Sequence, residues 1–217
     1  MRAVVVASGD LVPGDLRHLD GADLVIAADG GAAALERAGC RIDRLVGDLD
    51  SADPLLVERL GRSGTEVTQY PADKDASDTE LAVEAALDAG ASEVMLLGAL
   101  GGERLDHELA NVLLLADPVL GPPLRIARGT SLARAVRDGR RLDIVAGPGS
   151  LVTLLPIGAE VTGITTVGLR WTLEDATLPM GRSRGLSNEV LEAGASVQLG
   201  RGTLLVVETI IEGVNRS

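Results

Sequence analysis

The stretch Leu45-Val46-Gly47-Asp48-Leu49-Asp50-Ser51 is a short apolar strand that runs directly into two carboxylates. In an extended chain alternate side chains point the same way, so we expect Asp48 and Asp50 to face one point while Leu49 turns back toward the core. Convergent carboxylates repel unless a cation lies between them, and Mg²⁺ combines protein carboxylates with water and phosphate oxygens. The stretch predicts either metal-assisted phosphate chemistry or, equally well, only the solvated end of a strand.

Short apolar runs alternate with helix-like segments up to about residue 128. This alternation is typical of a mostly parallel sheet with crossover helices, so residues 1–130 are predicted to form an α/β domain. Asp29, Asp53 and the capping box Ser77-Asp78-Thr79-Glu80 are the helix starts, and glycines mark the ends. The predicted strands are 3–7, 24–28, 44–46, 66–69, 94–97 and 124–127, and the predicted helices are 32–38, 54–60, 77–89 and 105–116.

The pattern changes after Arg128 to short β-rich runs separated by Gly, Pro or Asp, with no convincing helix between them. Such runs predict a small antiparallel sandwich or barrel, so residues 131–217 are expected to form an all-β, sandwich-like domain. The boundary is expected between Arg128 and Gly139. The predicted strands are 141–145, 151–155, 164–167, 169–173, 196–199 and 203–208.

The composition narrows the choice of partners and compartment. The formal net charge of −12 over 217 residues argues against binding to nucleic acid or to a membrane surface, both of which are anionic. Cys40 is the only cysteine, which excludes an intrachain disulfide and favours a reducing compartment. No apolar run approaches the roughly 20 residues of a membrane span. A soluble, cytoplasmic protein is therefore expected.

Four strands of the first half end in loops rich in Asp and Gly, and in a parallel sheet such loops meet at one edge, where ligands bind. Helix capping is a sufficient explanation for Asp29, Asp78 or Asp106 taken singly. Together with the cations Lys74 and Arg104, the four loops favour a phosphate ligand. No dinucleotide fingerprint or Walker motif is present. The loops are 28–31, 47–51, 74–79 and 98–107.

Trp171 is the only tryptophan of the chain, and it lies in the β-rich half beside Arg170. The chain has no phenylalanine to share the packing, so a core position is the simpler interpretation. The neighbouring charges place the indole near water, where its face could stack on a flat heterocycle. The residues alone slightly favour the core.

Taken together, these segments resemble the thiamine pyrophosphokinase family. The resemblance extends over nearly the whole chain and rests on the order and spacing of motifs that are weak singly. The motifs are Asp29-Gly30-Gly31, Gly-Asp-x-Asp-Ser at 47–51, Lys-Asp-x-Ser-Asp-Thr-Glu at 74–80, Gly-Gly with Arg-Leu-Asp-His at 101–107, Leu169-Arg170-Trp171-Thr172-Leu173 and Ser187-Asn188-Glu189.

The resemblance implies an α/β catalytic domain that binds ATP and Mg²⁺, followed by a β-sandwich domain that binds thiamine. It also implies a homodimer that holds thiamine at the subunit interface. The implied reaction is attack of the thiamine hydroxyl on the β-phosphorus of ATP, which gives thiamine diphosphate and AMP. The choice of diphosphoryl over monophosphoryl transfer comes from the resemblance alone.

The resemblance also assigns roles to individual residues. It implies Asp48, Asp50 and Asp78 as metal ligands, with Asp106 as a fourth catalytic carboxylate, and it reverses the core interpretation of Trp171. One departure stands out: Glu103 separates Gly102 from Arg104, where the family reads Gly-Gly-Arg-x-Asp. The remaining implied contacts are Asp29, Gly30, Lys74, Ser77, Gly101, Gly102 and Arg104 for ATP, and Trp171, Ser187 and Asn188 for thiamine.

Two other functions fit parts of the sequence. A metal-dependent phosphohydrolase of the haloacid-dehalogenase type carries an Asp-x-Asp motif, but there it follows the first strand, whereas Asp48-Leu49-Asp50 follows the third predicted strand. A non-catalytic nucleotide-binding module would need only a capped acidic crevice without a metal. Such a module would bind ATP in the absence of Mg²⁺ and show no turnover.

Overall fold

The computed structural model describes residues 1–50, 52–121 and 123–211, and Ser51 of the acidic stretch lies outside them. The chain divides into two compact units, Met1–Gly129 and Thr130–Ser217. Among the described residues, no helix combines the length and apolar composition that crossing a membrane requires.

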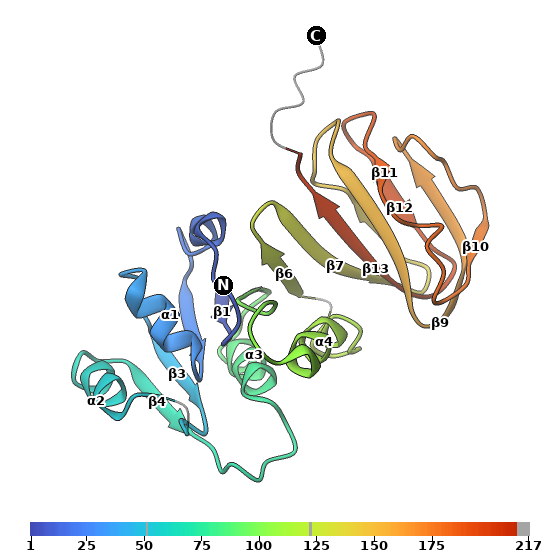
Figure 1. Ribbon diagram of the computed structural model, residues 1–217. Coiled ribbons are helices and arrows are strands. Elements are labelled where there is room, and N and C mark those ends of the chain that lie inside the picture. The colour runs from blue at the N-terminus through green and yellow to red at the C-terminus, as the bar shows by residue number, and fades with distance from the viewer. Residues whose placement is uncertain (51, 122, 212–217) are drawn as a thin grey trace. The chain divides into compact units, whose positions relative to one another are not determined.

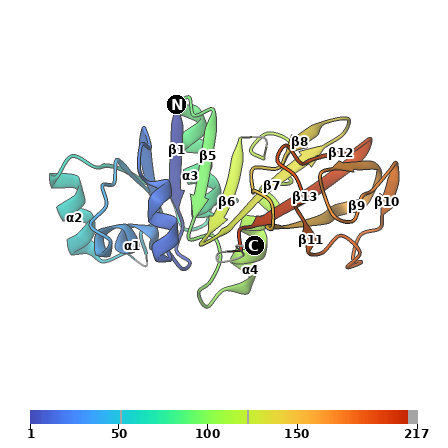
Figure 2. The ribbon, with the colours of Figure 1, turned by 90° about the horizontal axis from the view of Figure 1, so that it is seen from above.

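The Met1–Gly129 unit is built on a parallel sheet whose strands lie in the order β4-β3-β2-β1-β5-β6 (Figures 1 and 2). The α/β prediction is confirmed, with its strands and helices in the expected places. The strands are β1 (Arg2–Val6), β2 (Leu24–Ala28), β3 (Arg44–Gly47), β4 (Glu66–Gln69), β5 (Glu93–Leu97) and β6 (Leu124–Arg128); the helices are α1 (Gly31–Arg37), α2 (Pro54–Arg62), α3 (Asp78–Asp88) and α4 (Leu105–Leu114), with a short 3₁₀ helix at Pro13–His18.

The central strands are nearly continuous apolar runs because both faces of the sheet are covered. Val4, Ile26 and Leu96 have no exposed surface, and α3 packs across β1, β2, β3 and β5. Two helix starts follow the predicted chemistry: the Asp53 carboxylate accepts from the Leu55 N–H at 3.0 Å, and the Ser77 hydroxyl accepts from the Glu80 N–H at 3.1 Å. These caps fix where the loops at the carboxyl edge end.

The Thr130–Ser217 unit is strand-rich and antiparallel, as predicted for a sandwich-like domain. Its strands lie in the order β7-β13-β9-β12-β8, and β10 and β11 also pair with β9. The core is formed by side chains such as Leu154, Ile164 and Leu204. The strands are β7 (Ser131–Arg137), β8 (Arg141–Asp143), β9 (Leu151–Val167), β10 (Ala176–Leu178), β11 (Asn188–Glu189), β12 (Ser196–Gln198) and β13 (Arg201–Thr209).

The strands of this unit differ from the prediction in two places. The segments 151–155 and 164–167 belong to one strand, β9, because Pro156, Gly158 and Gly163 lie within the strand and do not form a turn, although both glycines have positive φ. The first half of β9 pairs with β13, and the second half pairs with β12 and β10. Segment 169–173 is no strand among the described residues and shows only an isolated bridge between Leu169 and Val190.

The strand β7 was missed because an inward-facing position is an arginine. Arg134 lies on the same face as Val136, and both are buried. The Arg134 guanidinium pairs with the buried carboxylate of Glu208 on β13, which also accepts from the Val145 and Ala146 N–H groups at 2.7 and 2.8 Å. A buried charge pair of this kind replaces the apolar alternation that marks a strand.

Candidate active site

The acidic stretch forms a compact carboxylate cluster at the carboxyl edge of the parallel sheet. One oxygen each from Asp29, Asp48 and Asp50 lies within 4.8 Å of the others. Asp29 follows β2 and the other two follow β3, its parallel neighbour, so the fold itself brings the three together. The structure thus places Asp29, expected among the ATP contacts, beside the predicted metal ligands.

The geometry of the stretch differs from the extended conformation predicted for it. The strand β3 ends at Gly47, and Leu49 is half-buried with φ of +62°, so it does not turn back into the core. The Asp50 N–H donates to Asp48 Oδ1 at 3.2 Å, which closes a tight turn. The two carboxylates therefore converge through this turn and not through strand alternation. A left-handed leucine is a strained conformation of the kind found at functional sites.

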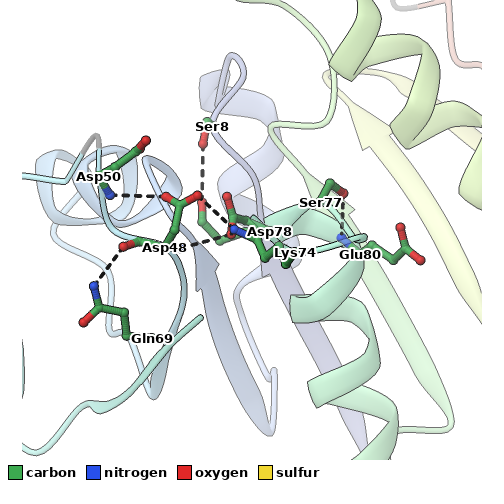
Figure 3. A network of polar contacts seen from close by, with 9 residues as sticks. Ser8, Asp48, Asp50, Gln69, Lys74, Ser77, Asp78 and Glu80 are labelled. Atoms are coloured by element: carbon green, nitrogen blue, oxygen red, sulfur yellow. Dashed lines mark hydrogen bonds and ion pairs between the residues drawn. The ribbon is translucent and has the colours of Figure 1, made fainter. Parts of the chain in front are cut away.

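Lys74 lies between Asp48 and Asp78 and is largely buried (Figure 3). Its Nζ is 2.9 Å from Asp48 Oδ2 and 3.0 Å from Asp78 Oδ1, and the Asp48 N–H donates to Asp78 Oδ1 at 3.2 Å. The hydrogen bond from Lys74 lowers the pKa of Asp48. Desolvation lowers the pKa of Lys74, but the bonds to both carboxylates outweigh it, so its pKa is raised. Asp78 thus partners Lys74 and is not part of the three-carboxylate cluster.

The carboxylates face a cleft of about 560 Å³ that the loops after β1, β2, β3 and β5 share with α3 and α4. Glycine is required where two of these loops meet, because a Cβ on Gly9 would lie 2.5 Å from the Gly98 carbonyl oxygen. Gly30 packs against Ser8 and is not among the lining residues. Predicted site residues that line the cleft are Asp29, Asp48, Asp50, Lys74, Ser77, Asp78, Gly101, Gly102 and Arg104.

The sequence interpretation missed Ser8, Gly9 and Asn111, which also line the cleft. Ser8-Gly9-Asp10 follows the first strand just as the other polar loops follow theirs, so the signal was present in the sequence. Asn111 gave no such signal, because it lies within α4, and its side-chain amide donates to the Ala99 carbonyl at 2.9 Å.

Arg104 and Asp106 form a two-pronged ion pair at the start of α4. Arg104 Nε lies 2.9 Å from Asp106 Oδ1, and an Nη lies 2.6 Å from Oδ2. Arg104 lines the cleft together with Glu103, whereas Asp106 is not among the lining residues. The hydrogen bonds from Arg104 hold the pKa of Asp106 far below its usual range. The N-cap of α1 is Gly30 and that of α4 is Arg104, so helix capping does not account for the presence of Asp29 or Asp106.

A second cleft, of about 760 Å³, lies within the Thr130–Ser217 unit. All three residues predicted to contact an aromatic ligand, Trp171, Ser187 and Asn188, line it. The side chain of Trp171 is 59% exposed, so the core interpretation of this residue is wrong. The cationic side chains of Arg170 and Arg184 line the same cleft.

The carboxylate cluster fits a hard divalent cation. Its donors are all carboxylate oxygens, with no sulfur or imidazole ligand among them, and such a set suits Mg²⁺. Asp48 contributes to this cluster with Asp29 and Asp50, and its Oδ2 is also 2.9 Å from the ammonium group of Lys74. The residues present therefore fit a divalent metal ion such as Mg²⁺.

The fold and the site define a protein in which an α/β unit carries an acidic cleft and is followed by a strand-rich unit. Two family models match the chain: "Thiamin pyrophosphokinase, catalytic domain" over residues 16–122 and "Thiamin pyrophosphokinase, vitamin B1 binding domain" over residues 141–204. The chain belongs to the thiamine pyrophosphokinase family.

Individual relatives agree with this assignment. A thiamine pyrophosphokinase of Bacillus subtilis is 25% identical over 209 residues, which are 94% of this chain and 97% of the relative. Thiamine pyrophosphokinase 3 of rice is 28% identical over 176 residues, covering 72% of this chain and 61% of the rice protein. The crystal structure of thiamin pyrophosphokinase from Geobacillus thermodenitrificans has a TM-score of 0.80 at 29% identity, covering 98% of this chain and 99% of the other. The Bacillus subtilis crystal structure, with a TM-score of 0.85 at 24% identity over 97% and 99% of the two chains, shares the fold.

Proposed function

We propose that this protein transfers the diphosphoryl group of ATP to the hydroxyl of thiamine and releases AMP. The observation that carries the proposal is the arrangement of Asp29, Asp48 and Asp50 around one point, with Lys74 beside them, in a chain of this family. In the proposal the Met1–Gly129 unit binds ATP and Mg²⁺, and the Thr130–Ser217 unit binds thiamine. The single cysteine, Cys40, is compatible with function in the cytoplasm.

On the ATP side, Asp29, Asp48 and Asp50 would hold Mg²⁺, which would neutralise charge on the polyphosphate and on the transferred group. Lys74 is positioned by Asp48 and Asp78 to face the phosphates, so Asp78 contributes by holding Lys74. Phosphoryl transfer depends mainly on positioning and charge neutralisation, so the metal, Lys74 and Arg104 would contribute more to the rate than a general base.

The remaining ATP contacts are polar groups at the cleft wall and mouth. Arg104, oriented by Asp106, offers a guanidinium to the polyphosphate. Gly101 and Gly102 have positive φ angles and expose backbone that a phosphate can approach closely. Ser77 caps the N-terminus of α3, which lies at the same cleft.

On the thiamine side, the exposed indole of Trp171 offers a flat face for the aromatic ring of thiamine. Ser187 and Asn188 are polar groups of the same cleft. Part of the proposal is a homodimer that places thiamine at the subunit interface. An apolar stripe on α4 supports the dimer, because exposed apolar surface is typical of a protein–protein contact. The stripe is formed by Leu105, Leu109 and Leu113, each of which is more than half exposed.

The reaction is tested by incubating the protein with Mg²⁺, ATP and thiamine and separating the products. AMP and thiamine diphosphate should form in equal amounts. ADP or inorganic phosphate as the product derived from ATP would contradict the proposal, the latter in favour of a phosphohydrolase. Binding of ATP without Mg²⁺ and without turnover would indicate a nucleotide-binding module.

The shared site is tested by mixing two variants, Asp50→Asn and Trp171→Ala, each of which damages a different cleft. The assay keeps thiamine far below the raised KM of Trp171→Ala, so that neither variant alone is appreciably active. If one subunit supplies the acidic cleft and its partner the Trp171 cleft, heterodimers regain one intact site and activity returns on mixing. If each subunit uses both of its own clefts, the mixture stays inactive. Light scattering of the unmixed protein checks that a dimer forms.

A further inference from the structure

A short antiparallel ladder leads up to Trp171 and ends one residue before it. The Leu191 N–H donates to the Gly168 carbonyl at 2.8 Å, Leu169 and Val190 form a bridge, and the Arg170 N–H donates to the Glu189 carbonyl at 2.9 Å. The next step along this ladder would pair Trp171 with residue 188. The strand β11, which contains residue 188, already pairs with β9 on its other side.

The side-chain amide of Asn188 takes the place of that missing backbone pair. Its Oδ1 accepts from the Trp171 N–H at 3.0 Å, and its Nδ2 donates to the Trp171 carbonyl at 2.7 Å. Both polar groups of the Trp171 backbone are thus held by one side chain that is only 7% exposed. An amide with an acceptor and a donor side by side can pair with one residue in this way, as a backbone peptide does in a ladder.

These contacts use most of the hydrogen-bonding capacity of Asn188. Its Oδ1 also accepts from the Glu189 N–H at 2.9 Å, so both lone pairs of the oxygen are engaged. Trp171, in contrast, is 59% exposed and lines the cleft. The chain thus presents an open aromatic face on a backbone that a buried amide fixes.

We propose that Asn188 is a positioning residue that acts on the aromatic ligand through Trp171, by fixing the backbone from which the indole projects. The inference rests on the proposed function, since it takes thiamine as the ligand of the Trp171 cleft. An exposed indole that is already oriented loses less conformational freedom when a ring stacks on it. Removing the amide should therefore weaken thiamine binding even though Asn188 keeps few groups for the ligand.

The test uses Trp171 as its own reporter, because it is the only tryptophan of the chain. Time-resolved fluorescence anisotropy of the ligand-free protein reports local motion of the indole. We expect faster motion in Asn188→Ala and in Asn188→Asp, which keeps the size and the acceptor but loses the donor to the Trp171 carbonyl. Ser131→Ala, which removes a side-chain hydrogen bond elsewhere in the same unit, should leave the motion unchanged.

Steady-state kinetics then separate the two substrates. The KM for thiamine should rise roughly tenfold in both Asn188 variants, as expected for the loss of one or two buried hydrogen bonds, while the KM for ATP stays unchanged. In a Trp171→Ala background, Asn188→Ala should raise the thiamine KM no further. If Asn188→Ala destabilises the fold, Asn188→Asp gives the same readouts with the side-chain volume kept.

Two results would overturn the inference: unchanged indole motion with weaker thiamine binding, which would make Asn188 a direct contact, or additive effects of the two substitutions. Failure of the proposed function gives a different result. In that case the wild-type protein would not convert or bind thiamine, whereas the anisotropy of the ligand-free protein would still show whether Asn188 holds Trp171.

Discussion

The acidic cleft of the Met1–Gly129 unit is held together by charge, whereas the Trp171 cleft of the Thr130–Ser217 unit is held mainly by neutral hydrogen bonds. Lys74 bridges Asp48 and Asp78 in the first. In the second, an amide holds the Trp171 backbone, and the Thr153 hydroxyl accepts from the Ser187 N–H at 3.0 Å. One ion pair, Arg170 to Glu189 at 2.9 Å, lies beside the indole.

This difference matches the tasks proposed for the two clefts. A site for polyphosphate needs charges that are already oriented, because reorienting them during the reaction would cost free energy. A site for a flat ring such as the neutral aminopyrimidine of thiamine needs a fixed surface, which strand pairing and side-chain amides provide. Substitutions that alter charge should therefore reduce activity most in the first cleft, and substitutions that alter shape should reduce it most in the second.

The largest effect is expected from Asp50→Asn. Loss of one carboxylate from the Asp29, Asp48 and Asp50 cluster should lower kcat by at least about 100-fold, because the metal would lose a charged ligand. The rate of AMP formation measures it. Asp53→Asn is the matched control, since it makes the same change in charge three residues away while asparagine caps α2 equally well. A near-normal rate for Asp50→Asn would show that the metal assignment is wrong.

The next largest effect is expected from Trp171→Ala, which should change the KM for only one of the two substrates. Removing the exposed indole is expected to raise the KM for thiamine by roughly 10- to 100-fold, the range measured for loss of ring stacking. The KM for ATP should stay the same. Leu191→Ala, which removes a similarly exposed apolar side chain of the same unit, serves as control. An equal rise in both KM values would indicate a general structural role for Trp171.

The two units also differed in how far the sequence predicted them. Strand and helix positions of the α/β unit followed from apolar runs and caps such as Asp53 and Ser77, because that information is local. The meeting of acidic loops at one edge followed from the topology of parallel sheets. The turn at Leu49 and the pairing of Lys74 with Asp78 did not, because they depend on side-chain contacts.

The β unit was harder to predict because its pairings are distant in sequence. The strand β7 carries an inward arginine whose partner, Glu208, is 74 residues away, so no local pattern reveals it. Pro156 and Gly158, which lie within β9, are residues typical of a turn between two strands. Trp171 is exposed, and its backbone pairs with Asn188, a contact that the sequence shows only as two separate motifs.

The pair of Arg104 and Asp106 offers a smaller and more specific test of the charged cleft. Arg104→Gln should raise the KM for ATP roughly tenfold through loss of a charge-assisted bond to phosphate. Because Asp106 contacts Arg104 and is not among the cleft-lining residues, Asp106→Asn should have no further effect in the Arg104→Gln background. Arg62→Gln, which breaks an exposed pair with Glu58 on α2, is the control. Additive effects would instead make Asp106 a separate catalytic group.

The smallest expected effect is a change in titration. The guanidinium of Arg104 lowers the pKa of Asp106, so Arg104→Gln should return that pKa to the ordinary carboxyl range near 4. Carboxyl-carbon NMR across an acid titration measures it. A group with a lowered folded pKa adds stability above its unfolded pKa and loses it as pH falls through the folded value. Both side chains are about two-thirds exposed, so the contribution should be small and weaken with salt.

The same titration separates the two clefts. The indole motion of Trp171 should not follow the protonation of Asp106, because the Asn188 amide that holds its backbone does not titrate. If the pKa of Asp106 in the wild-type protein is that of a free carboxyl group, the ion pair between Asp106 and Arg104 does not form in solution. In that case Asp106→Asn would leave the KM for ATP unchanged, and the orientation of Arg104 would have to come from the α4 backbone alone.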